Sequence, residues 1–274
     1  MRAELHCHSN YSFQEGASSV EDLLVRARDL GYRALALTDH DNLCGAMHFA
    51  QVAKTLDIQS ITGAELTIKD GEDGRDNSHL TFLAETREGY SQLSNLMSYS
   101  YVSSDRRNPA LDLKYLPDRV HGLVLLTGCR VGRVPSLLTD GRYAEAETQL
   151  RRYLDWFGTD NVFVELQQNL VQGDTSRNRR LIDLARKLGV PTVATNNVHY
   201  HVSERHRLQD ALVSIKNNLS LEQTHKERRA NNQFYLKSSE EMAALFSRCP
   251  EAIKNTLRIA ERCSFDLTKD LAYS

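Results

Sequence analysis

The chain has 274 residues, of which 41% are apolar and 26% are charged, and its formal net charge is −2 at pH 7. This length suits one α/β barrel or two smaller domains, and the charge excludes a strongly basic nucleic-acid module. No apolar run approaches the ~20 residues that span a bilayer, and the polar N-terminus has no signal-peptide character, which predicts a cytoplasmic protein without a membrane segment. The five cysteines are widely spaced, so a disulfide framework is not expected.

Seven short apolar runs recur along the chain and are predicted to be β-strands. Several are apolar at successive positions rather than at alternate ones, as in 34–37 and 123–126. That pattern is typical of parallel strands buried on both faces. The predicted strands are residues 3–7, 33–38, 59–66, 80–84, 122–127, 161–166 and 192–195.

Amphipathic segments lie between these runs. Ser18 and Glu21 have capping-box spacing before a helix at 20–30, and further helices are predicted at 143–157 and 178–188. The alternation implies right-handed crossovers, and seven strands favour a closed, TIM-like (β/α) barrel over an open sheet. After residue 202 the pattern is helical, and its predicted helices are 204–215, 239–246 and 251–263, the second opened by a capping box at 238–241. We therefore expect an α/β barrel at 1–202 and a helical C-terminal extension packed on it at 203–274.

Histidines and carboxylates concentrate near the ends of the predicted strands. In a parallel barrel the strand C-termini converge on one face, where active sites lie. His6 and His8 are two apart on a strand, so both imidazoles point the same way, which suits a transition metal. Asn197 and His199 repeat this spacing after the last strand. The segments concerned are 6–8, 38–41, 63–65, 78–80, 128–129 and 197–199.

Single residues in these segments suggest roles. Asp39 and His40 are adjacent and should point to opposite sides, so we assign His40 as a ligand and Asp39 as its supporting carboxylate. Glu65 ends a strand, where a carboxylate could bridge two metals. Cys129 also follows a strand and would offer a soft thiolate to zinc. His79 instead precedes a strand, which conflicts with a strictly parallel barrel.

Each feature also has a purely structural interpretation. The HxH pair of His6 and His8 occurs often by chance, and residues 39–42 can form a turn that caps a helix. Glu65 can be a surface glutamate, and a lone Cys129 is most simply a buried core residue. Only the combination of these features favours a metal site.

Six motifs occur in order: HxHxxYS at 6–12, TDHxNLxGA at 38–46, GAE at 63–65, HLTFLA at 79–84, LTGC at 126–129 and ATNNVHY at 194–200. Together they resemble the PHP domain (polymerase and histidinol phosphatase) of bacterial DNA polymerase III alpha-type subunits. The likeness continues through FYLKSSEEM at 234–242 and AERCSFDL at 260–267, so it covers nearly the whole chain. The segments ATNNVHYH and LSLEQTHKERR are more similar to the error-prone type of alpha subunit.

The resemblance implies a distorted seven-stranded barrel that holds two or three divalent metal ions, which are zinc, manganese or iron in this family. It implies three ligand groups: His6, His8, Glu65 and Asn197 for the first ion, Glu65, His79 and Cys129 for the second, and Glu15, His40 and His199 for the third. Two positions depart from the family. Asn197 stands where aspartate is usual, and Glu15 stands where histidine or aspartate is usual. A neutral amide should bind its metal more weakly.

The implied chemistry is phosphoester hydrolysis, in which a metal-activated hydroxide attacks phosphorus and Asp39 acts only in support. In a polymerase the expected substrate is a DNA 3′ end, giving 3′–5′ exonuclease or proofreading activity, with the basic segment 226–229 as the expected phosphate contact. The expected partners are the remainder of a polymerase chain, toward which residues 203–274 lead, or its accessory subunits. Two alternatives stay open: a catalytically weak metal-binding structural module that supports the polymerase, and a free-standing small-molecule phosphatase.

Overall fold

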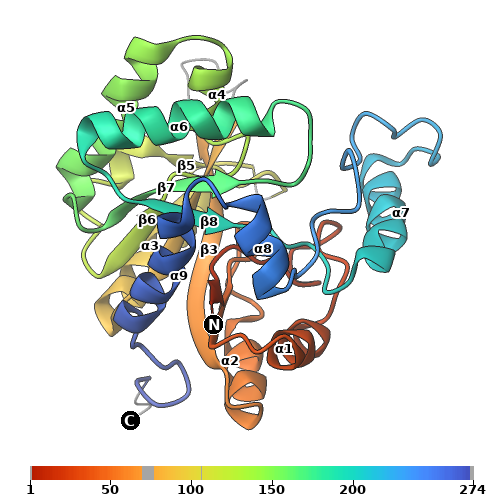
Figure 1. Ribbon diagram of the computed structural model, residues 1–274. Helices are drawn as coiled ribbons and strands as arrows, with labels where there is room; N and C mark the ends of the chain where they lie inside the picture. Colours follow the sequence, from red (N-terminus) through yellow and green to blue (C-terminus); the bar gives the residue numbers. More distant parts are fainter. Residues whose placement is uncertain (1, 70–76, 106, 272–274) are drawn as a thin grey trace.

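A computed structural model describes residues 2–69, 77–105 and 107–271 of the chain (Figure 1). Strands and helices alternate through most of it. The strands are β1 Ala3–Glu4, β2 Ala34–Leu37, β3 Gln59–Lys69, β4 Asn77–Ala84, β5 Leu111–Asp112, β6 Leu123–Leu126, β7 Val162–Gln167 and β8 Thr192–Thr195. The α-helices are α1 Val20–Asp29, α2 Ala46–Thr55, α3 Arg87–Val102, α4 Arg133–Thr139, α5 Tyr143–Phe157, α6 Asp174–Leu188, α7 His206–Asn217, α8 Ser239–Leu245 and α9 Pro250–Arg262. Two 3₁₀ turns, at Leu113–Tyr115 and Ser203–Arg205, complete the described elements.

The sheet is a nearly closed barrel. Seven strands follow one another in the order β1-β2-β3-β4-β6-β7-β8, and the short β5 pairs with the far end of β3. Beyond the ends of β1 and β8, Cys7 forms a parallel bridge with Val198 that brings the first and last strands together. The predicted seven-stranded α/β barrel is confirmed.

Strand β4 departs from the predicted parallel arrangement. It pairs antiparallel with both β3 and β6, whereas the other neighbours along the sheet are parallel. Only residues 70–76 separate β3 from β4, and a parallel connection needs a crossover of about a dozen or more residues. The expectation of uniformly parallel strands was therefore wrong for β4.

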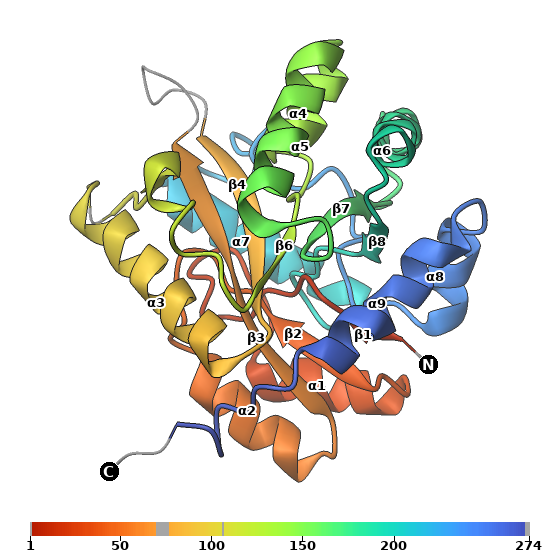
Figure 2. The same cartoon turned by 90° about the vertical axis from the view of Figure 1, so that its left-hand side faces the viewer.

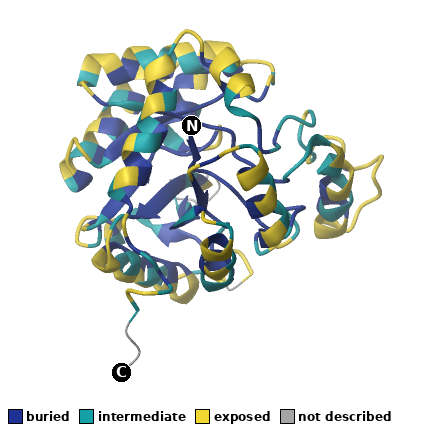
Figure 3. Ribbon diagram, turned by 60° about the horizontal axis from the view of Figure 1, so that its bottom comes forward, coloured by how far each residue is buried: buried dark blue, intermediate teal, exposed yellow. Residues whose placement is uncertain are grey.

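Burial explains why the strand runs are continuously apolar. Every residue of β2, β6 and β7 is buried, because one side faces the barrel interior and the other faces the surrounding helices. In Figure 3 the strands are mostly buried, while the helices expose their outer faces. Helices α5 and α6 each bury an apolar stripe, as the sequence predicts for residues 143–157 and 178–188, although α6 begins earlier, at Asp174.

The two predicted capping boxes have different outcomes. Ser238 and Glu241 form the box that opens α8, as predicted. The box at Ser18 and Glu21 was wrong by one residue, since α1 is capped by Ser19 with Asp22 as the reciprocal partner. Helix α1 begins at Val20, so the third helical position falls on Asp22.

The three helices predicted after residue 202 are present as α7, α8 and α9. Helix α9 covers the place where β1 and β8 approach each other, as Figure 2 shows. The Ala3 backbone N–H donates to Thr256 Oγ1 at 3.3 Å, and the Gln59 side chain donates to the Ala260 carbonyl at 2.7 Å. No helix in the described ranges is both long and apolar enough to cross a membrane.

Candidate metal centre

The strand ends bring the predicted residues to one edge of the barrel. The antiparallel β4 begins at this edge, so His79 lies opposite Thr67 of β3 and near Glu65, despite its place at a strand start. This resolves the conflict that His79 poses in a wholly parallel barrel. The other predicted residues belong to these segments: His6 and His8 after β1, Glu15 before α1, Asp39 and His40 after β2, Glu65 in β3, Cys129 after β6, and Asn197 and His199 after β8.

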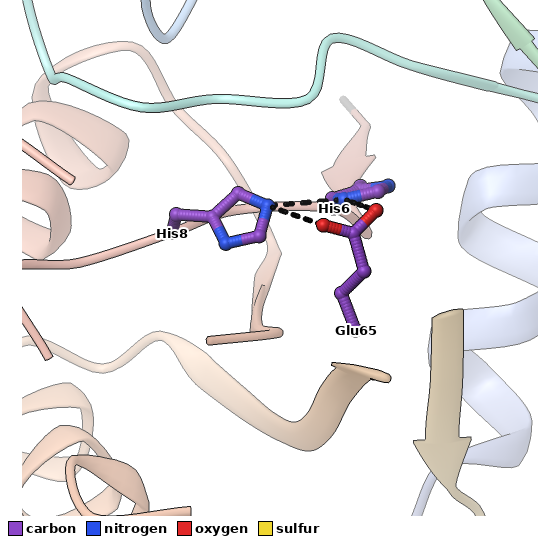
Figure 4. A group of neighbouring side chains, drawn as sticks. All are labelled: His6, His8 and Glu65. Carbon is purple, nitrogen blue, oxygen red and sulfur yellow. Dashed lines mark hydrogen bonds and ion pairs between the residues drawn. The ribbon is translucent and has the colours of Figure 1, made fainter. Parts of the chain in front are cut away.

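His6, His8 and Glu65 form a compact buried group (Figure 4). The two Nε2 atoms of the histidines lie 3.1 Å apart, and they lie 3.4 and 3.5 Å from the two carboxylate oxygens of Glu65. Donor atoms placed about 2.1 Å from one zinc ion in a tetrahedron are roughly 3.4 Å apart. Glu65 Oε1 is buried and accepts no hydrogen bond from the described residues. These three side chains therefore fit a divalent metal ion.

Hydrogen bonds behind the two imidazoles select the tautomers that a metal needs. His6 Nδ1 donates to Glu165 Oε1 at 2.7 Å, so once His6 is neutral its Nε2 lone pair faces Glu65. Ser12 Oγ donates to Asp39 Oδ1 at 2.7 Å, so it must accept from His8 Nδ1 at 3.0 Å. His8 is thereby fixed with its Nε2 lone pair toward Glu65.

His79 extends this group on the other side of Glu65. Its Nδ1 lies 3.4 Å from Glu65 Oε1 and 3.6 Å from Cys129 Sγ. A second set of donor atoms within metal-binding range consists of His40, Glu65 and His79. Glu65 belongs to both sets, which is the arrangement of a carboxylate that bridges two ions.

The charges of this region balance one another. Burial disfavours the charged form of His6, but the negative charges of Glu165 and Glu65 outweigh this effect and raise its pKa to about 10. In the same way, Glu65 outweighs burial at His79 and raises the pKa of His79 to about 10. Burial lowers the pKa of His8 to about 3. Burial opposes the charge of Glu65, but His79 and His6 hold its pKa well below the usual range. Glu65 is therefore ionised, and His6 and His79 must release protons before they can ligate a metal.

The predicted third group is arranged differently. Glu15 accepts from Lys216 Nζ at 2.5 Å and lies 2.9 Å from His40 Nδ1. Burial opposes the charge of Glu15, but His40 and Lys216 lower its pKa. His40 Nε2 lies 2.9 Å from Thr67 Oγ1. Among the described residues, Glu15, His40 and His199 do not form a compact set of donor atoms.

His199 lies beside a cation instead. Its Nε2 contacts Nη2 of Arg229 and lies 2.9 Å from the side-chain amide of Asn197. Burial is the main cause that holds the pKa of His199 well below its usual range, and the nearby charge of Arg229 lowers this pKa further. The His199 ring also stacks on His8 with centroids 4.4 Å apart, so this part of the site adjoins the first group.

Comparison with known proteins identifies the family of the chain. The sequence model of the PHP domain matches residues 4–169, which is more than half of the chain. The chain belongs to the PHP domain family.

The curated relatives of this PHP domain are DNA polymerases. An error-prone DNA polymerase from Symbiobacterium thermophilum is 41% identical over 94% of this chain and 25% of its own length. A DNA polymerase III subunit alpha from Treponema pallidum is 40% identical over 95% of this chain and 23% of its own length. The chain thus spans about a quarter of the relatives it matches. A solved amidohydrolase structure from Chromobacterium violaceum has a TM-score of 0.46 at 15% identity, covering 73% of this chain and 88% of the other.

The sequence does not predict Glu165 as a partner of His6, and it predicts Arg229 only as part of the phosphate-contacting segment 226–229. Glu165 is fully enclosed in β7 and holds His6, and Arg229 reaches His199 from the segment after α7. A carboxylate inside an apolar strand run was a usable signal for Glu165, since charged residues are almost never fully buried unless paired. Asp39, predicted to be a supporting carboxylate, accepts hydrogen bonds from Ser9 and Ser12, and through Ser12 it orients His8.

The site opens into a cavity of about 670 Å³. Glu15, Glu65, His79 and His199 line it on the barrel side. Six cationic side chains contribute to its walls: Arg130, Arg177, Lys216, Lys226, Arg228 and Arg229. Three of these pair with carboxylates, namely Arg177 with Asp174, Lys216 with Glu15 and Arg228 with Asp210. Within the described ranges the other three make no ion pair, so the cavity is suited to an anionic ligand.

Proposed function

We propose that this PHP domain is a metal-dependent phosphoesterase. The observation that carries the proposal is the Glu65 carboxylate, which is buried among His6, His8 and His79 with one oxygen free of hydrogen bonds. Buried polar atoms in proteins are nearly always satisfied, so an unsatisfied carboxylate oxygen among imidazoles points to a cation.

Two overlapping sets of residues would hold the metal ions. His6, His8 and Glu65 would hold one, and Glu65 with His79 and Cys129 would hold another, with His40 adjacent. When bound, divalent ions of this kind lower the pKa of water and neutralise the charge that develops on a transferring phosphoryl group. Burial and the charge of Glu65 raise the pKa of the Cys129 thiol, so its thiolate would form only together with a nearby cation.

The chain's own residues have positioning and binding roles in this proposal. Glu165 and the Asp39–Ser12 pair hold the imidazoles of His6 and His8 in the ligating tautomer. The unpaired cations of the cavity would hold phosphate oxygens, and this includes Lys226 and Arg229 of the segment predicted to contact phosphate.

For the substrate we propose a DNA 3′ end, giving 3′–5′ exonuclease activity. This rests on the relatives, which are named DNA polymerases and are about four times longer than this chain. The remainder of such a polymerase chain is the proposed partner.

Nucleotide release from a 3′-labelled DNA primer tests this function. We expect release with added manganese or zinc, abolition by EDTA, and loss of at least ~100-fold in His8→Ala, because that variant removes a ligand of the first group. His121→Ala is the matched control, since His121 is an exposed histidine outside the cavity. Equal activity of the His8→Ala variant and the wild-type protein would contradict the proposed site.

A second candidate is a metal-binding structural module that supports the polymerase without hydrolysis. Asn197 favours it, because a neutral amide here lies against His199 rather than supplying a carboxylate. Bound metal with no release from DNA or from a generic phosphomonoester would support this function. Release from the phosphomonoester alone would instead indicate a small-molecule phosphatase.

A further inference from the structure

Arg229 is a cation in the wall of the cavity and has no counterion among the described residues. Its guanidinium lies over the ring of Phe234 at 4.5 Å and contacts His199 Nε2. Within the described part of the chain it makes no ion pair, and its Nε is buried without a hydrogen-bond partner. The neighbouring Arg228, by contrast, is paired with Asp210 at 3.0 Å.

The segment that carries Arg229 is fixed at both ends. On one side, the buried Thr224 bonds to Ser214 of α7 at 2.9 Å, next to the Arg228–Asp210 pair. On the other side, Asn231 donates to the Asn169 carbonyl at 2.8 Å. Arg229 therefore lies on a span that is tied to α7 and to the loop after β7, which holds it in place over the site.

The contacts of Arg229 exclude a metal ion on His199. His199 Nε2 lies between Nη2 of Arg229, which can only donate, and Oδ1 of Asn197 at 2.9 Å, which can only accept, so this nitrogen already has a partner in either tautomer. Glu15 is likewise engaged by Lys216. Two side-chain cations thus lie against two of the three residues that a third ion would need.

We propose that Arg229 replaces a third metal ion, so that the domain holds two ions and Arg229 binds the phosphate of the ligand directly. A guanidinium presents paired N–H donors that match two phosphate oxygens, and it is always charged. The phosphate role rests on the proposed phosphoesterase function, whereas the number of ions does not.

The first test is the metal content of the wild-type protein, saturated with manganese or zinc and then freed of excess ion by gel filtration. Mass spectrometry of the metals should give two ions per chain. Three tightly held ions per chain would overturn the proposal.

The second test is binding of inorganic phosphate to the metal-loaded protein by calorimetry. Arg229→Ala should weaken binding ~10–100-fold, and Arg229→Lys should weaken it less, because a charge-assisted hydrogen bond is lost in the first and partly kept in the second. Arg151→Ala is the control and should bind phosphate like the wild-type protein, since Arg151 is an exposed arginine outside the cavity that pairs with Glu147. Unchanged phosphate affinity in both Arg229 variants would overturn the proposal.

These readouts separate the inference from the proposed function. Neither metal content nor phosphate affinity requires hydrolysis. The protein could bind two ions, and bind phosphate through Arg229, yet release no nucleotide. That result would support the inference and contradict phosphoesterase activity. Circular dichroism establishes that each variant is folded, and the wild-type metal content tests the proposal without any variant.

Discussion

The two sides of the cavity use the same residue types in opposite ways. Around Glu65, three histidines face one carboxylate, and none of the described lysines or arginines pairs with it. Around Glu15 and His199, the protein supplies its own cations, Lys216 and Arg229. The difference suggests a rule for this cavity: histidines and carboxylates can hold a metal ion where no lysine or arginine already pairs with them.

Loss of Glu65 should have the largest effect, because Glu65 belongs to both ligand sets. Glu65→Gln should lower metal affinity by more than ~100-fold, beyond the 10–100-fold that loss of a supporting residue costs. Metal titration followed by mass spectrometry measures it. Glu15→Gln is the control on the other side of the cavity and should change metal content little. If the two variants lost metal affinity equally, the two sides of the cavity would not differ in metal binding as we infer.

Glu165→Gln should have the next largest effect. Glutamine cannot accept from His6 Nδ1 as strongly as the carboxylate does, so the imidazole loses the partner that fixes its tautomer. We expect metal affinity to fall about 10–100-fold without loss of fold. The exposed Glu251→Gln is the matched control. If Glu165→Gln binds metal as tightly as the wild type, Glu165 is only a packing residue.

The pH dependence should be roughly tenfold in metal affinity per pH unit for each proton released. His6 and His79 have pKa values of about 10, so they are protonated at pH 7 and must lose protons to bind metal. Affinity should therefore rise with pH between 6 and 8. Calorimetry in buffers of different ionisation enthalpy should also detect proton release on binding. An affinity independent of pH over this range would show that the two imidazoles are already neutral.

The sequence predicts well those strands and helices that are set by a pattern of neighbouring residues. The apolar runs of β2, β6, β7 and β8 and the stripe of α5 are found as expected, because each is set by burial of neighbouring residues. The direction of β4 is not a local property. It follows from the short connection of residues 70–76, whereas the predicted strand bounds 59–66 and 80–84 left residues 67–79 between them, long enough for a crossover.

For the site, strand-end position predicts which residues meet but not what neutralises them. His6, His8, Glu65 and His79 converge because their strands end or begin at one edge. Arg229 lies far along the chain in a polar segment where solvated charge is the usual state. Its approach to His199 depends on tertiary contacts of that segment, such as Asn231 with Asn169, which no spacing rule reports.

The bridge between Cys7 and Val198 joins the closure of the barrel to the segment that carries His6 and His8. His8 N donates to the Val198 carbonyl and Val198 N donates to the His6 carbonyl, so the segment that carries two ligands also closes the barrel. A ribosome delivers His6, His8 and Glu65 early and Val198 only after β7 and α6. The three side chains proposed to hold the first ion therefore all emerge before the last strand, so that ion would draw its ligands from a chain whose barrel is still open.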